Sequence, residues 1–126
     1  MAFLNRVILI GNSTKDAEVR QTGTGKQVCN FAIATNEYWK SPSGEQMSES
    51  EFHYITAWDR LAEIAVKFVK TGRKIYIEGR KRTTKFPKDG VEVERVEIIA
   101  HKIMTLDKAP SEEYAKPYQG EYNGNF

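Results

Sequence analysis

The sequence has few of the residues on which catalysis and metal binding depend. It contains one cysteine, Cys29, and two histidines, His53 and His101, which are far apart. Neither a disulfide nor a His/Cys metal site fits this spacing. There is also no glycine-rich phosphate loop and no obvious pair of carboxylates suited to acid–base work. We therefore expect a protein that is not an enzyme and that has no catalytic residue, metal or cofactor.

Long apolar segments are missing as well. No run approaches the length needed to cross a bilayer, and the first residues do not resemble a signal peptide. Cys29 lies in an apolar pattern, which favours a small buried side chain in a reducing compartment. These features predict a cytoplasmic protein with no membrane contact. With 126 residues and a formal net charge of +2, the chain has room for one core, and its overall charge says little about partners.

Five segments have the composition of β-strands: residues 6–10, 27–35, 51–58, 74–80 and 91–100. The first is a continuous apolar run, which is typical of a well-buried strand. One segment after Trp58 has the helical period, with Asp59 placed to cap it and Gly72 to end it. Its apolar positions are Leu61, Ile64, Ala65, Phe68 and Val69.

Three strands, one helix and two strands is the element order of the five-stranded OB barrel. We therefore predict an all-β fold with one helix between the third and fourth strands. An α+β sandwich has the same element order, but Gly79 within a strand favours the bend that a closing barrel needs. Residues 107–126 contain Pro and Gly without any period, which predicts a flexible C-terminal tail after a domain formed by residues 1–106.

Aromatic and basic residues gather in three stretches, at residues 37–40, 52–58 and 80–86. In the middle stretch, the strand period places Phe52, Tyr54, Thr56 and Trp58 on one face and His53 on the other. One face is expected to pack the core and the other to expose flat rings. Rings beside Arg and Lys suit single-stranded nucleic acid, because bases stack on the rings while cations hold the phosphates.

The candidate contacts fall into two groups. The stacking candidates are Trp39, Phe52, Tyr54, Trp58 and Phe86, of which Trp39 and Trp58 are the first choices. The strongest phosphate candidates are in the basic stretch at residues 80–88, where few acids neutralise the charge: Arg80, Arg82 and Lys85. Further candidates are Lys15, Arg20, Lys40, Arg60, Arg73 and Lys74. Tyr76 fits either the core or an interface.

Seven short motifs along the chain have a recognisable order and spacing. They occupy residues 5–12, 16–20, 31–39, 52–53, 61–63, 76–79 and 82–83. In these motifs, residues 5–106 resemble the bacterial and mitochondrial single-stranded-DNA-binding proteins. The chain departs from the family pattern at Ala17, where proline is usual, at Phe52, where tryptophan is common, and at Trp58, where phenylalanine is common.

The resemblance implies an OB fold, four OB domains in a working homotetramer, and sequence-tolerant coating of single-stranded DNA in replication, recombination and repair. It carries the stacking roles onto Trp39, Phe52, Trp58 and Phe86, and an interface role onto His53, with Tyr76 as a second interface candidate. A bacterial or phage origin fits better than the mitochondrial matrix.

The C-terminus departs from the family. Most bacterial members end in several aspartates followed by Ile-Pro-Phe, which recruits replication and repair proteins. Residues 121–126 keep the final phenylalanine but lack the acidic cluster. Either the tail was cut or this member never had a tip, as in mitochondrial and some phage relatives, so recruitment of such partners through the tail is in doubt. Two other functions stay open: a related OB module that binds RNA or acts in a primosome, and an OB-fold nuclease, against which the missing metal spacing argues.

Overall fold

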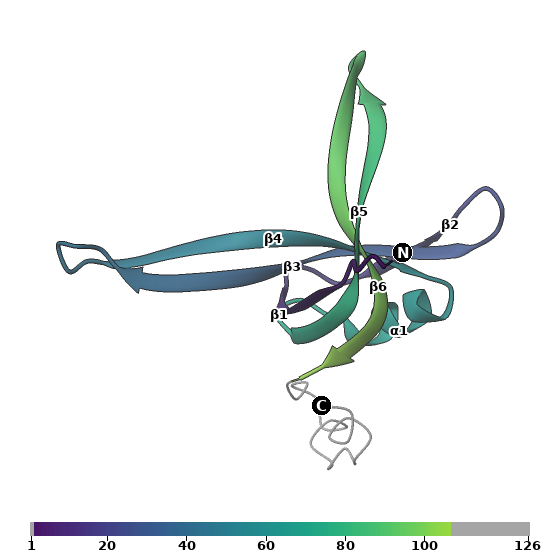
Figure 1. Cartoon of the computed structure of the whole chain (residues 1–126). Helices are drawn as coiled ribbons and strands as arrows, with labels where there is room; N and C mark the ends of the chain where they lie inside the picture. The colour runs from purple at the N-terminus through teal and green to yellow at the C-terminus, as the bar shows by residue number, and fades with distance from the viewer. Residues whose placement is uncertain (1, 107–126) are drawn as a thin grey trace, which may run out of the picture.

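The computed structural model describes residues 2–106, so the predicted tail at residues 107–126 lies outside the described part. Figure 1 shows a small barrel with two long hairpins projecting from it. The elements are β1 (Val7–Ser13), β2 (Glu18–Gln21), β3 (Gln27–Lys40), β4 (Gln46–Trp58), α1 (Arg60–Phe68), β5 (Lys74–Lys88) and β6 (Val91–Thr105).

Five of the strands close into a barrel. The sheet order is β1-β5-β6-β4-β3-β2, and β1 also pairs with β3 through Asn12 opposite Ala34 and Ser13 opposite Ile33. All described pairings are antiparallel except the one between β4 and β6. The predicted five-stranded all-β barrel with one helix is therefore confirmed. The short β2, which pairs along β3, was not predicted.

The core consists of alternate residues of the barrel strands. Ile33, Ile55, Ile75 and Ile77 are at most 1% exposed. Cys29 is also fully buried, as predicted, and burial raises the pKa of its thiol to about 11, with a smaller effect from Glu18. This thiol is therefore protonated at neutral pH and packs as a small apolar group.

Helix α1 packs against the barrel through a slightly different stripe from the predicted one. Ala62, Ala65 and Val69 are fully buried, whereas Leu61 and Ile64 are only half-buried, because small side chains let the helix approach the sheet closely. Asp59 occupies the N-cap position, as predicted, but its side chain makes no capping hydrogen bond. Its backbone carbonyl accepts from the amides of Ala62 and Glu63 instead.

The prediction that residues 6–10 form a well-buried strand is wrong for one of the two faces of the strand. Val7 and Leu9 face the core, but Ile8 and Ile10 are 52% and 50% exposed. A barrel strand has only one inner face, and no described element of the chain covers the outer face of β1. Alternate residues of the continuous apolar run therefore pack against the core, and the residues between them are exposed.

Gly79 marks the bend in β5, as predicted. The register between β5 and β6 shifts between Glu78 and Gly79, which identifies a β-bulge. A Cβ atom at Gly79 would lie 2.1 Å from the carbonyl oxygen of Ile99. Only glycine permits this close approach of the two backbones, and the bulge turns β5 from the barrel into the projecting hairpin.

Candidate nucleic-acid interface

The outer face of β4 carries the predicted row of aromatic residues. Phe52 and Tyr54 are 54% and 50% exposed, whereas Ile55 and Ala57, which follow them on the other face of the strand, are buried. Trp58 is half-buried at the end of the row. The alternation predicted from the sequence is therefore confirmed, because the inner residues belong to the core and the outer ones face away from it.

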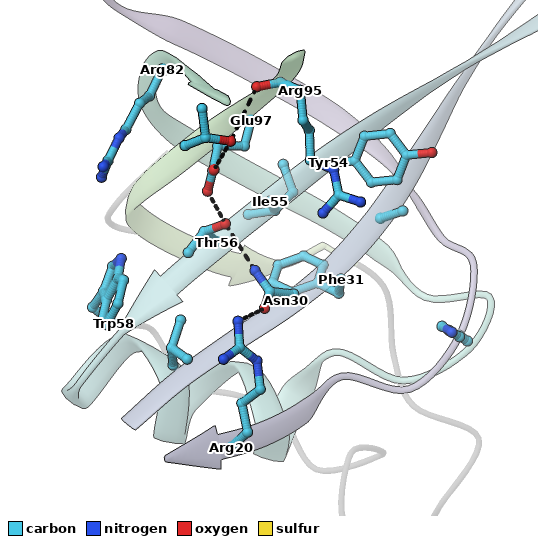
Figure 2. A pocket seen from close by; sticks show the side chains of 14 residues that line it. Arg20, Asn30, Phe31, Tyr54, Ile55, Thr56, Trp58, Arg82, Arg95 and Glu97 are labelled. Atoms are coloured by element: carbon cyan, nitrogen blue, oxygen red, sulfur yellow. Dashed lines mark hydrogen bonds between the residues drawn. The ribbon is translucent and has the colours of Figure 1, made fainter. Parts of the chain in front are cut away.

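A groove with a cavity of about 420 Å³ lies over this face, between β4 and the β5–β6 hairpin. Trp58 and Tyr54 line it, and Thr56 forms part of its floor (Figure 2). Four cationic side chains also line it: Lys15, Arg20, Arg82 and Arg95. The first three were predicted to contact phosphate, and the fold brings them together from three separate segments of the chain.

A chain of hydrogen bonds crosses the floor of the groove (Figure 2). Arg20 Nη2 donates to Asn30 Oδ1 over 3.1 Å, and Asn30 Nδ2 donates to Thr56 Oγ1 over 2.9 Å. Thr56 Oγ1 then donates to Glu97 Oε1 over 2.5 Å, and Thr84 Oγ1 lies 3.2 Å from Glu97 Oε2. These bonds connect β2, β3, β4, β6 and β5 and hold the floor in one arrangement.

Arg95 is the most informative residue that the sequence analysis missed. Its Cζ atom lies 5.4 Å from the centroid of the Tyr54 ring and 5.5 Å from that of Phe86, within the range of cation–π attraction. It therefore connects β4 to the projecting β5–β6 hairpin. A second hollow of about 500 Å³, lined by Phe52, Tyr54, Phe86 and Arg95 among others, continues the groove beyond this point.

A turn signal in the sequence could have located Arg95. The β5–β6 hairpin has the two-residue turn Asp89-Gly90, and both residues have positive φ, at 52° and 78°. This is the Asp-Gly pattern of a tight hairpin, and it sets the register that places Thr84 opposite Arg95.

Trp39 lies in a different place from the other predicted rings. It is 44% exposed and pairs with Met47 near the far end of the β3–β4 hairpin. Because Met47 and Trp58 are an odd number of residues apart on β4, the pleat puts Trp39 on the opposite face of the ribbon from Phe52, Tyr54 and Trp58. It is also about 17 Å further along the ribbon than Phe52, at about 3.4 Å per residue.

The other predicted cations are dispersed. Lys85 is on the opposite face of β5 from Phe86 and forms an exposed ion pair with Glu94, at 3.8 Å. Arg73 is only 6% exposed, so its predicted phosphate contact does not fit its burial. The remaining ones are exposed and do not line the groove: Arg80 on β5, Lys74 at its start, Lys40 near the hairpin tip, and Arg60 beside a separate hollow.

The two interface candidates are both partly buried. His53 points away from the row of rings, as predicted, and its Nε2 lies 2.9 Å from Thr35 Oγ1. Tyr76 donates from its hydroxyl to Glu78 Oε1 over 3.1 Å, and Glu78 also pairs with Arg6. The hydrogen bond from Tyr76, with help from Arg6, holds the pKa of Glu78 below its ordinary value, although partial desolvation opposes this.

Two kinds of feature are absent from the part of the chain that the structure describes. Within residues 2–106, no group of three or more His, Cys, Asp or Glu side chains is arranged to hold a metal ion. The helix in this part of the chain is too short to span a membrane.

Fold and site together define a class of protein: an OB barrel with a groove lined by exposed rings and cations. Comparison with known proteins identifies the family. The model of the single-strand binding protein family matches residues 4–106, and the chain belongs to this family.

Curated relatives agree with this assignment. The chain is 39% identical over 120 residues to a single-stranded DNA-binding protein of Neisseria meningitidis, a match that covers 94% of this chain and 69% of the relative. It is 46% identical over 80 residues to single-stranded DNA-binding protein 1 of Chlorobaculum tepidum, covering 64% of this chain and 49% of the relative.

Solved structures share the fold. The SSB of Plasmodium falciparum in complex with ssDNA superimposes with a TM-score of 0.75 at 27% identity, covering 85% of this chain and 98% of that one. A deletion mutant of the single-stranded DNA binding protein from Thermus aquaticus has a TM-score of 0.70 at 28% identity, covering 82% and 51%.

Proposed function

We propose that this protein binds and coats single-stranded DNA with tolerance for sequence. One observation carries the proposal: the groove over β4 combines the exposed ring of Tyr54 and the half-buried ring of Trp58 with cations from separate segments, among them Arg20, Arg82 and Arg95. Every base has a flat face that stacks on an aromatic ring, and every nucleotide has a phosphate that a cation neutralises. Such a groove binds many sequences, and the bound strand cannot pair with a complement.

The DNA contacts that we propose follow the geometry. Phe52, Tyr54, Trp58 and Phe86 would stack on bases along the groove, and Lys15, Arg20, Arg82 and Arg95 would hold phosphates. Trp39 and Lys40 would contact the DNA only when the bound DNA is long enough to leave the groove and follow the β3–β4 hairpin. Arg73 and Lys85 are left out because one is buried and the other faces away.

The protein would act as a non-enzymatic binder in DNA replication, recombination and repair, in the bacterial cytoplasm and near the nucleoid. The similarity to the Neisseria and Chlorobaculum proteins supports this setting.

We further propose a homotetramer. Ile8 and Ile10 form an apolar outer surface on β1, and their cross-strand neighbours on β5 are Glu78 and Tyr76. Burial of these two half-exposed isoleucines of β1 against another protein surface is favourable. The family resemblance indicates that this surface belongs to a second copy of the chain. A DNA strand that wraps several linked OB domains would also gain effective concentration at each successive contact.

Equilibrium binding to fluorescently labelled oligomers tests the function. We expect tight binding to oligo(dT), much weaker binding to duplex DNA, and weaker binding to RNA of matched sequence. Preference for the RNA would favour the RNA-binding alternative, and cleavage of labelled DNA in the presence of divalent metal would favour the nuclease.

A matched pair of variants on β5 tests the geometry. Arg82 lines the groove and Lys85 does not, although both are exposed cations three residues apart. Each phosphate contact contributes about −0.7 to the slope of log K against log salt. Arg82→Gln should therefore flatten this slope by about one contact, whereas Lys85→Gln should leave it unchanged. Equal effects of the two variants would contradict the proposed path.

A further inference from the structure

Glu97 is an unexpected residue for the floor of a groove that binds a polyanion. Its carboxylate lines the cavity among cations and aromatic rings. A negative charge at this position repels phosphates, and connecting β4 to β5 would need only a neutral polar side chain. The carboxylate must therefore make a favourable interaction that offsets this repulsion.

The hydrogen bonds of Glu97 orient it and leave part of it free. Oε1 accepts from Thr56, and Oε2 accepts from Thr84. A carboxylate has about four lone-pair positions, so each oxygen retains capacity for a further donor. Because the two anchoring hydroxyls belong to β4 and β5 of the barrel itself, the carboxylate is held in place before any ligand arrives.

The spacing of the rings places a base above this carboxylate. Tyr54 and Trp58 are four residues apart on β4, which corresponds to about 13 Å, with Thr56 midway between them. Stacked nucleotides are about 3.4 Å apart in a duplex strand, so a strand that uses both rings has at least one base between them. In Figure 2, Thr56 and Glu97 lie between Trp58 and Tyr54.

We propose that Glu97 accepts a hydrogen bond from the exocyclic amino group of that base, so that the groove prefers cytosine or adenine to thymine or uracil at this one position. The inference rests on the proposed binding of single-stranded DNA. Cytosine presents its N4 amino group as a donor, whereas thymine and uracil present the O4 acceptor, which a carboxylate repels. The groove is thus tolerant of sequence at its stacking positions and selective at its polar floor.

Oligomers of deoxycytidine and deoxyuridine of equal short length provide the test. Their bases have similar rings and differ in the amino or carbonyl group at position 4, which limits the effect of stacking differences. We expect the unmodified protein to bind the deoxycytidine oligomer about two- to tenfold more tightly, as one hydrogen bond of ordinary strength implies. Glu97→Gln should bring this ratio close to one, because an amide can donate to O4 and accept from N4.

Glu92→Gln is the matched control. It makes the same change of charge five residues away on β6, at an exposed position that lines neither the groove nor the second hollow. This control should leave the ratio of deoxycytidine to deoxyuridine affinity unchanged. It therefore distinguishes a general gain of affinity, caused by removing any acid, from a change in base preference. An equal ratio in the Glu97→Gln variant and the unmodified protein would overturn the inference.

A second measurement needs no variant. An oligomer whose cytosines carry two methyl groups on N4 lacks the donor hydrogens but retains the ring. It should bind to the unmodified protein as weakly as the deoxyuridine oligomer, and binding as tight as that of deoxycytidine would overturn the inference even if Glu97→Gln fails to fold. If the unmodified protein binds none of the oligomers at low salt, the proposed function itself fails.

Discussion

Removal of the Trp58 ring should be the most damaging single change to DNA binding. Trp58 is half-buried at the end of the aromatic row, lines the groove, and pairs across the strands with the buried Val28. Loss of one base stack costs about 1–3 kcal/mol, so Trp58→Ala should weaken binding about five- to 150-fold. The alanine variant should still melt cooperatively, because the indole face that a base would cover is not part of the core.

The two tryptophans of the chain allow the stacking to be assigned to one ring. Trp39→Phe leaves only Trp58, and Trp58→Phe leaves only Trp39. Because the pleat puts the two rings on opposite faces of the β3–β4 ribbon, a short oligo(dT) confined to the groove should quench Trp58 strongly and Trp39 weakly. A longer strand that leaves the groove and follows the hairpin should quench Trp39 as well.

Tryptophan-selective fluorescence titration measures both variants, and thermal melting checks that each is folded. Equal quenching of the two rings by the short oligomer would refute the assignment of faces. Unchanged Trp58 emission at saturating DNA would refute stacking on this ring altogether.

Three further predictions concern stability and assembly. Gly79→Ala should destabilise the domain by about 1–3 kcal/mol in chemical denaturation, because the new Cβ meets the Ile99 carbonyl, whereas Gly23→Ala, with open space around it, should have little effect. His53→Asp should shift the tetramer towards dimer or monomer in sedimentation at low concentration, and a fully tetrameric variant would remove His53 from the interface. Hydrogen bonds from the Thr71 amide and hydroxyl, with help from Lys70, hold the pKa of Asp16 below its ordinary 3.8 despite desolvation, which opposes this. Charged Asp16 therefore stabilises the fold above pH 3.8, and this stabilisation is lost as the pH falls through the lowered pKa. The difference in melting temperature between the unmodified protein and Asp16→Asn should accordingly shrink between pH 7 and about pH 3.

The local pattern of the sequence was enough to assign the faces of β4. A strand has a period of two, so Phe52, Tyr54 and Trp58 share a face wherever the strand lies in the fold, and the buried Ile55 and Ala57 confirm the assignment. The position of the bulge at Gly79 was also local information, because a glycine within a strand pattern indicates a bulge or a bend. The close approach to Ile99 is the structural reason for the glycine. The element order and the family resemblance then predicted the barrel.

Most relations between strands were not available from local patterns; the β5–β6 register, which the Asp89-Gly90 turn sets, is the exception. The register of the β3–β4 hairpin decides that Trp39 and Trp58 face opposite ways, and barrel closure brings Arg95 of β6 to Tyr54 of β4. Within its own segment, Arg95 belongs to a run of glutamates, and nothing there distinguishes it from a solvated cation. The acceptor role inferred for Glu97 likewise depends on hydroxyls from two other strands.

The sequence by itself therefore determined which side chains can stack, which can hold phosphate, and which strand face each one occupies, because the strand period is a property of neighbouring residues. Only the tertiary structure decided which of these side chains meet in one groove, which one is buried, as Arg73 is, and which apolar residues, such as Ile8 and Ile10, stay exposed. The physical reason is that register and barrel closure depend on backbone pairing between segments far apart in the chain, and a single residue shift in register would turn every side chain of a strand to the other face.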